Sequence, residues 1–238
     1  MLPLGEAAII VEFGRCIHPD IHRQVKAFAD YLDIHPFPGM IEYVSAFSSV
    51  TVFYDPLTVR KLPVENLNGI MPQSYQIVTA LLHNLLANVD VTVKQHPRVV
   101  EIPVCYGGEF GPDLGYVAEH NQLSVEEVIE IHTSGQYLVY MIGFAPGFPY
   151  LGGMSERIMA PRRQSPRLAI PAGTVGIAGM QTGVYPIETP GGWQLIGRTP
   201  LALFRPQDNP PSLLQSGDIV RFCQISDKEY EEYKEEDQ

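Results

Sequence analysis

The sequence predicts an α+β protein in which an α/β domain, residues 1–94, precedes an antiparallel β-barrel or sandwich, residues 95–238. Three observations support this fold class. The first part orders its apolar patterns as strand, helix, strand, strand, helix. Glycine and proline then recur every few residues between Gly143 and Pro200, too often for helices. The composition changes near Lys94–Pro97, where we expect the domain boundary, and 238 residues suffice for two modest domains.

In the first part, helices are expected to cover one face of a small sheet, which gives a sandwich-like α/β domain. Residues 6–14 are an apolar run typical of a strand, and Pro19 opens a helix. After a turn at residues 37–40, two strands follow, and a second helix begins after Pro72. The first helix has an apolar stripe at helical spacing: Ile21, Val25, Phe28, Ala29 and Leu32. The second strand after the turn alternates between two sets of side chains, Val50, Val52 and Tyr54 against Thr51 and Phe53. The second helix has a similar stripe: Tyr75, Val78, Leu82, Leu85, Leu86 and Val89.

The second part is expected to begin with a strand at residues 99–108 and two short helices. The first helix runs over about residues 112–120. The second begins at Ser124, whose hydroxyl completes a capping box with Glu127, and Gly135 can end it. One face of the second helix carries four side chains: Val125, Val128, Ile129 and His132. A strand at residues 137–144 and several short strands follow, and the acidic tail from Asp227 forms a solvated helix or a frayed end.

The stretch from Gly143 to Pro200 leaves two interpretations open. It contains GFAPGFPYLGG, PRRQSPR, PAGTVGIAGMQTGVYP and TPGGWQLIGRTP, with polar and aromatic residues between the glycines. In one interpretation the glycines only form the tight corners of a barrel. In the other, the loops of that barrel also line a pocket for a small molecule.

Charge and hydropathy exclude several classes of function. The formal net charge of -11 argues against nucleic-acid binding, which needs a basic surface. No apolar run is long enough for a transmembrane helix, and the N-terminus lacks a basic region, so a cytoplasmic location is expected. Three widely spaced cysteines indicate buried thiols and no disulfide framework. Between Lys94 and Lys228 the cations other than histidine are all arginines, a pattern that fits either an anion site or ordinary salt bridges.

Common catalytic motifs are absent from the sequence. It has no P-loop, no G-x-G-x-x-G fingerprint, no G-x-S-x-G elbow and no zinc motif, so no metal site is predicted. A chain that used ATP would therefore do so without the common motif or together with a partner.

Three polar residues are catalytic candidates, each with a structural alternative. Asp113 is either an ordinary acid at a helix N-terminus or a carboxylate at a pocket mouth. His132, on an apolar helix face, is either a hydrogen-bonded core residue or a general acid or base. Gln181 is either a turn residue or a hydrogen-bonding group for an amide.

The substrate-binding candidates are aromatic and cationic side chains. Arginines could bind a carboxylate, although each alone is more often part of a surface ion pair; Arg162 and Arg163 belong to this set. Trp193, the single tryptophan, could form a pocket wall or part of the core. The selected residues are Tyr106, Phe148, Tyr150, Arg167, Tyr185, Trp193 and Arg198.

Several long segments resemble the Kip inhibitor family, whose members are named as the B subunit of the prokaryotic 5-oxoprolinase and formerly as the first subunit of allophanate hydrolase. They are PVCYGGEFGPDL, GFAPGFPYLGGM, PAGTVGIAGMQTGVYPIETPGGWQLIGRTP, LALFRPQDNPP and FPGMIEYVSAFSSVTVFYDP. Within the family they are most similar to the inhibitors of a sporulation kinase of bacilli. The resemblance implies a cyclophilin-like barrel, and a complex with subunits A and C that opens 5-oxoproline to glutamate using ATP. It also implies inhibition of a sensor histidine kinase through its dimerisation helices.

Two functional hypotheses follow from this resemblance. The first is an enzyme subunit, in which neutral donors hold the lactam and an arginine holds its carboxylate. The second is an inhibitor that acts by binding alone and needs an exposed apolar patch. The candidate patch consists of Leu151, Met154, Ile158 and Met159.

Overall fold

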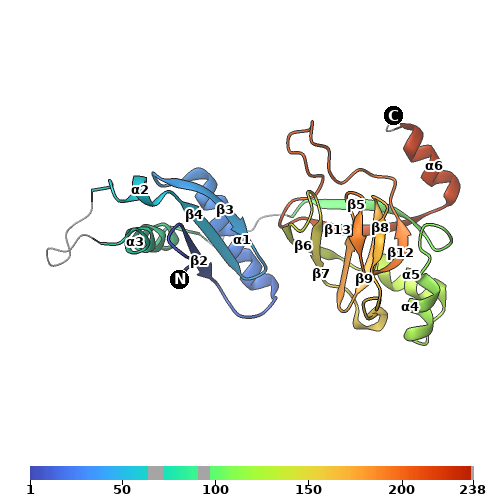
Figure 1. Cartoon of the computed structure of the whole chain (residues 1–238). Helices are drawn as coiled ribbons and strands as arrows, with labels where there is room; N and C mark the ends of the chain where they lie inside the picture. The colour runs from blue at the N-terminus through green and yellow to red at the C-terminus, as the bar shows by residue number, and fades with distance from the viewer. Residues whose placement is uncertain (64–71, 91–96, 237–238) are drawn as a thin grey trace. The chain divides into compact units, whose positions relative to one another are not determined.

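The chain forms two compact units, Met1–Gln95 and His96–Gln238, in a computed structural model that describes residues 1–63, 72–90 and 97–236 (Figure 1). The predicted domain boundary falls at residues 94–95, which lie outside the described residues. Among the residues that the structure describes, no helix combines the length and the apolar character needed to cross a bilayer.

Unit 1 contains a four-stranded antiparallel sheet whose strand order is β1-β2-β4-β3, and Figure 1 shows β4 between β2 and β3. The helices α1 and α3 contact the strands and each other, as the sequence predicted. The strands are β1 (Leu2–Pro3), β2 (Ala8–Glu12), β3 (Met40–Ser45) and β4 (Ser49–Tyr54), and the helices are α1 (Pro19–Ile34), α2 (Pro56–Val59) and α3 (Ser74–Ala87).

The predicted alternation in β4 is confirmed, because Val50, Val52 and Tyr54 are buried. The predicted stripe of α3 is wrong at Tyr75, which is exposed, while Ser74 and Ile77 are buried instead. The Ser74 hydroxyl donates to the carbonyl of Pro56 in α2. The sequence prediction missed α2, and this contact turns the start of α3 toward it.

Unit 2 contains a seven-stranded sheet of order β10-β9-β12-β5-β13-β6-β7. Its end strands approach each other: a Cβ on Gly183 of β10 would lie 3.4 Å from the carbonyl oxygen of Pro149 in β7, so the sheet is a nearly closed barrel. The strands are β5 (Val99–Tyr106), β6 (Tyr137–Ile142), β7 (Pro149–Gly152), β9 (Thr174–Ala178), β10 (Gln181–Val184), β12 (Gln194–Arg198) and β13 (Ile219–Ile225).

The expectation of an antiparallel barrel needs one correction. The strands β5 and β13 pair in parallel from Val99 opposite Ile219 to Cys105 opposite Ile225. The chain between these two strands contains the rest of the barrel, so it is long enough for the crossover that parallel strands require. The other ladders of this sheet, within the described residues, are antiparallel.

Helices and a small ribbon complete unit 2. The predicted capping box of Ser124 and Glu127 is present, and Gly135 ends that helix. The backbone of Gly135 is extended and not left-handed. A Cβ on Gly135 would lie 2.6 Å from the Tyr137 ring, which explains why a glycine is needed there. These elements are α4 (Leu114–His120), α5 (Val125–Ser134), the short 3-10 helix η1 (Glu156–Ile158), α6 (Asp227–Glu236) and the two-stranded sheet of β8 (Arg167–Ile170) and β11 (Thr189–Gly191).

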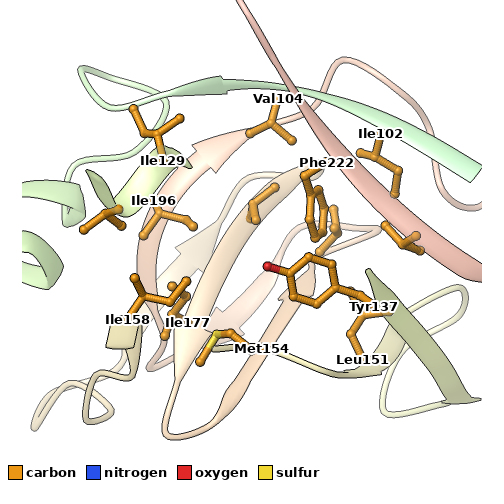
Figure 2. Packing of buried hydrophobic residues seen from close by; sticks show 14 of the residues in the cluster. Ile102, Val104, Ile129, Tyr137, Leu151, Met154, Ile158, Ile177, Ile196 and Phe222 are labelled. Atoms are coloured by element: carbon orange, nitrogen blue, oxygen red, sulfur yellow. The ribbon is translucent and has the colours of Figure 1, made fainter. Parts of the chain in front are cut away.

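The barrel interior is filled by apolar side chains from the strands and from α5 (Figure 2). Leu151, Met154 and Ile158 point into this core, and only Met159 of the expected apolar patch is exposed. The prediction that these four residues form an exposed patch is therefore wrong. The chain that follows Gly153 packs against the barrel, and its side chains Met154 and Ile158 face the core.

Candidate functional site

A buried carboxylate, Asp113, connects the start of α4 with strand β12 and with the loop at residues 161–166. Both Nη atoms of Arg167 donate to it, at 2.8 and 2.9 Å, in the bidentate geometry that suits a carboxylate. Arg163 Nη1 donates at 3.1 Å, and the backbone N–H of Leu195 donates at 2.8 Å. Asp113 occupies the N-cap position of α4, but its carboxylate binds the arginines and does not cap the helix.

A glycine allows this carboxylate to reach β12. A Cβ on Gly111 would lie 2.0 Å from the carbonyl oxygen of Ile196, so the backbone here approaches the strand more closely than any other residue permits. The N–H of Asp113 then donates to the carbonyl of Leu195 at 2.9 Å. Strand and turn thus fix both the backbone and the side chain of Asp113.

A cavity of about 520 Å³ opens beside this carboxylate. Its lining includes two arginines and one aspartate, a formal charge of +1, together with neutral polar groups. Arg163 Nε is buried and has no hydrogen-bond partner among the described residues. The lining residues are Asp113, Tyr116, Pro161, Arg162, Arg163, Gln164, Ser165 and Gln194.

Four of the predicted substrate-binding residues form one aromatic cluster. The Phe148 ring lies 5.3 to 5.8 Å from the rings of Tyr150, Tyr185 and Trp193, each in an edge-to-face arrangement. Phe148, Tyr185 and Trp193 are buried, and none of the four lines the cavity. Burial raises the pKa of Tyr185 to about 12, against the opposing effects of a hydrogen bond with the Trp193 backbone and of the charges of Arg162 and Arg167. The cluster therefore borders the arginine loop, and its role in binding stays a prediction.

His132 lies inside the barrel core, with no exposed surface. Its Nδ1 is 2.7 Å from the hydroxyl of Tyr106 in β5, and its Nε2 is 2.9 Å from the hydroxyl of Thr182 in β10. The imidazole also stacks on Phe222, with ring centres 4.5 Å apart. His132 thus joins α5 to three strands of the barrel, and the structure does not bring it to the cavity.

The hydrogen-bond chain through His132 has one consistent direction. Thr182 donates its hydroxyl proton to the carbonyl of Gly176, so it accepts from His132 Nε2. Nδ1 then accepts from Tyr106. Burial lowers the pKa of His132 to about 3 and raises that of Tyr106 well above its ordinary value, so both groups are neutral near pH 7.

Gln181 and Arg198 belong to none of these three groups. Gln181 begins β10 and is half-buried, and its neighbour Thr182 is the residue that bonds to His132. The Arg198 guanidinium carbon lies 5.7 Å from the ring centre of Phe110, beside Tyr230 of α6. The ten predicted site residues thus divide into the Asp113–Arg167 pair, the aromatic cluster, the Tyr106–His132 pair and these two separate residues.

Sequence reasoning did not select Thr182, Tyr116 or Gln194 as site residues. Thr182 and Val184 are two positions apart in β10, so their side chains face the same side of the strand, and this spacing could have indicated from the sequence that Thr182 is buried. Tyr116 and Gln194 meet only through the tertiary fold, so no local pattern identifies them. Among the described residues no three His, Cys, Asp or Glu side chains are grouped so as to hold a metal ion.

Comparison with known proteins identifies the family. The family model described as carboxyltransferase domain, subdomain C and D, matches residues 1–214. The B subunit of 5-oxoprolinase from Bacillus subtilis (strain 168) is 58% identical over 233 residues, which cover 98% of this chain and 95% of that protein. The chain belongs to the family of 5-oxoprolinase B subunits. The member from Escherichia coli O157:H7 is 40% identical and covers 92% of this chain and 93% of its own length.

Solved structures contain the same fold inside longer chains. The crystal structure of TTHA0988 is 35% identical with a TM-score of 0.76, and the match covers 92% of this chain but 40% of that one. The K. lactis urea amidolyase shares the fold at 19% identity, with a TM-score of 0.72 over 97% of this chain and 15% of its own. In both, the matched region is a minority of a larger polypeptide.

Proposed function

We propose that this chain is the B subunit of an ATP-dependent 5-oxoprolinase, which opens 5-oxoproline to L-glutamate together with subunits A and C. The observation that carries the proposal is the 58% identity to a 5-oxoprolinase B subunit along nearly the whole of both chains. The cationic cavity beside Asp113 supports it, because 5-oxoproline is a small monoanion. We further propose that the nearly closed barrel is a cyclophilin-like barrel.

The reaction needs activation of an unstrained lactam, and ATP supplies the phosphoryl group that can activate the amide oxygen. The described residues do not fit ATP itself. The cavity lining has a formal charge of only +1, and the sequence has no P-loop. We therefore assign ATP binding to a partner subunit and assign to this chain the binding and orientation of the small substrate.

Several chain residues would act on substrate without forming a covalent bond to it. Arg167 holds the Asp113 carboxylate, and Asp113 in turn holds Arg163, so the guanidinium of Arg163 at the cavity wall is oriented before substrate binds. The polar lining residues Tyr116 and Ser165 can donate hydrogen bonds to the ring amide. His132, although selected from the sequence as a catalytic residue, would contribute by holding α5 to the barrel.

The kinase-inhibitor alternative has less support. Curated relatives at 58% and 40% identity carry the name of the 5-oxoprolinase subunit. The apolar patch on which the inhibitor hypothesis depended is largely buried. We therefore rank the enzyme subunit first and cytoplasmic kinase binding as a second activity to be measured.

A reconstitution assay tests the proposal. The full chain is combined with subunits A and C, 5-oxoproline and ATP, and glutamate release is measured with each subunit omitted in turn. We expect release only when this chain is present. Release that continues unchanged without this chain would contradict the proposal, and kinase autophosphorylation would then be the next assay.

A further inference from the structure

We propose that Arg162 binds the carboxylate of a small cyclic amino acid in the cavity beside Asp113, an assignment that rests on the proposed function for the identity of the ligand. The carboxylate would lie against the Arg162 guanidinium, with the lactam ring among the neutral lining groups. Arg162, and not the arginines that Asp113 already holds, is then the specificity-determining residue.

The ion pairs of the cavity single out Arg162. Asp113 accepts two hydrogen bonds from Arg167 and one from Arg163, so both of these guanidinium groups already face a carboxylate. Arg162 is exposed, and no ion pair involves it within the part of the chain that the structure describes. It therefore provides the unpaired positive charge of the lining.

The loop that carries Arg162 is fixed on both of its sides. The side-chain amide of Gln194 donates to the carbonyl of Pro161 at 2.8 Å. The N–H of Arg163 donates to the carbonyl of Gly192 at 2.7 Å. Because its two neighbours are bonded to one segment, the Arg162 backbone is held in place, and the entropy lost when a ligand binds is confined to the Arg162 side chain.

Charge and size both favour a small monoanion. The lining has a formal charge of +1, and Arg167, paired with Asp113 behind it, brings the local charge to +2, which suits a small anion better than the several charges of a nucleoside triphosphate. A volume of about 520 Å³ is within the range of small-molecule pockets. Arginine binds the anionic oxygens of inorganic phosphate as well as those of a carboxylate, so the experiment must separate the two ligands.

The single tryptophan provides a built-in reporter for binding. Trp193 lies between Gly192 and Gln194, the two residues that bond to the arginine loop, so a ligand on Arg162 should change its fluorescence. All the lining residues belong to unit 2, and binding should therefore be measurable with the full chain in the absence of other subunits.

The test is a titration of the full chain with 5-oxoproline, with 2-pyrrolidone, which has the same ring without the carboxylate, and with inorganic phosphate. Binding is measured both by Trp193 fluorescence and by calorimetry, and calorimetry detects binding even if the fluorescence does not change. Arg162→Gln is compared with Arg157→Gln, a matched exposed arginine on η1 outside the cavity. We expect Arg162→Gln to weaken 5-oxoproline binding about tenfold or more and Arg157→Gln to leave it unchanged.

Several outcomes would overturn this proposal. They are no binding of 5-oxoproline to the unmodified chain, equal binding of 2-pyrrolidone, tighter binding of phosphate, or equal affinities of the two arginine variants. The reconstituted complex separates this proposal from the proposed function. Glutamate release that needs this chain but has an unchanged KM with Arg162→Gln would remove the carboxylate site and keep the subunit function. If 5-oxoproline binds this chain but glutamate release does not need the chain, the carboxylate site stands and the subunit function is removed.

Discussion

His132 and Asp113 are both buried polar side chains that join separate elements of unit 2, yet their surroundings differ. His132 has neutral partners, Tyr106 and Thr182, and lies in a core without access to solvent. Asp113 has cationic partners and lies at the wall of a cavity. Burial alone therefore does not indicate a functional site. A closed neutral network stabilises the fold, whereas a charged network beside a cavity orients groups that a ligand can reach.

The largest expected effect is that of His132→Ala. The substitution removes a buried ring and leaves Tyr106 and Thr182 without their partner, so we expect a loss of about 4 kcal/mol in the free energy of unfolding. Urea denaturation followed by Trp193 fluorescence measures it. His120→Ala, at an exposed histidine of the same unit, is the control and should change stability little. A loss below about 1 kcal/mol for His132→Ala would show that the network is not a structural one.

The next largest effect concerns the charged network around Asp113. Asp113→Asn should cost about 3 kcal/mol, the low end for breaking a buried ion pair, because Arg163 is 36% exposed and is partly solvated. Its coupling to Arg167→Gln in a double-mutant cycle should be strong, since the two residues share two hydrogen bonds. Additive effects of the two substitutions would mean that the ion pair does not hold the loop.

The pH dependence of stability should report on the His132 network. The pKa of His132 is about 3 in the folded protein and near its ordinary value of about 6.5 when unfolded. The unfolded chain therefore binds more protons below pH 6.5, and stability is lost as the pH falls, by about 2 kcal/mol between pH 6.5 and 5. Denaturation curves at several pH values, followed by Trp193, measure this loss for unit 2.

His132→Gln is the matched variant for this measurement and should lack that part of the slope. His22, whose pKa burial lowers to about 4, contributes in the same direction in unit 1, where there is no tryptophan. An identical slope for the His132→Gln variant would assign the pH dependence to other groups.

Local patterns predicted much of the fold, and tertiary contacts account for what they missed. The alternation in β4 and the capping box at Ser124 depend on neighbouring residues and were confirmed. Tyr75 was misplaced because contacts with α2 determine which face of α3 is buried. The inward turn of Leu151 and Met154 likewise depends on the barrel around them.

The site was predictable in its residue types but not in its grouping. Asp113 and Arg167 were both selected, yet their pairing spans 54 positions in the sequence and neutralises the charges that made each of them a candidate. His132 was selected because it lies on the apolar face of its helix, and that face is buried in the core, where a ligand cannot reach it. Arg162 could not be separated from its neighbours by sequence, because only the pairing of the other arginines distinguishes it.

The smallest expected effect concerns the geometry of the Asp113 network. Arg167→Lys keeps the charge but loses the two parallel hydrogen bonds, so we expect a loss of about 1 kcal/mol in stability. Arg163→Lys, which replaces one longer bond at a more exposed position, should cost less. Denaturation of both variants in the same buffer gives the comparison. A larger cost for Arg163→Lys would place the main support of the carboxylate on the cavity side, and Arg163 would then replace Arg167 as the residue that orients Asp113.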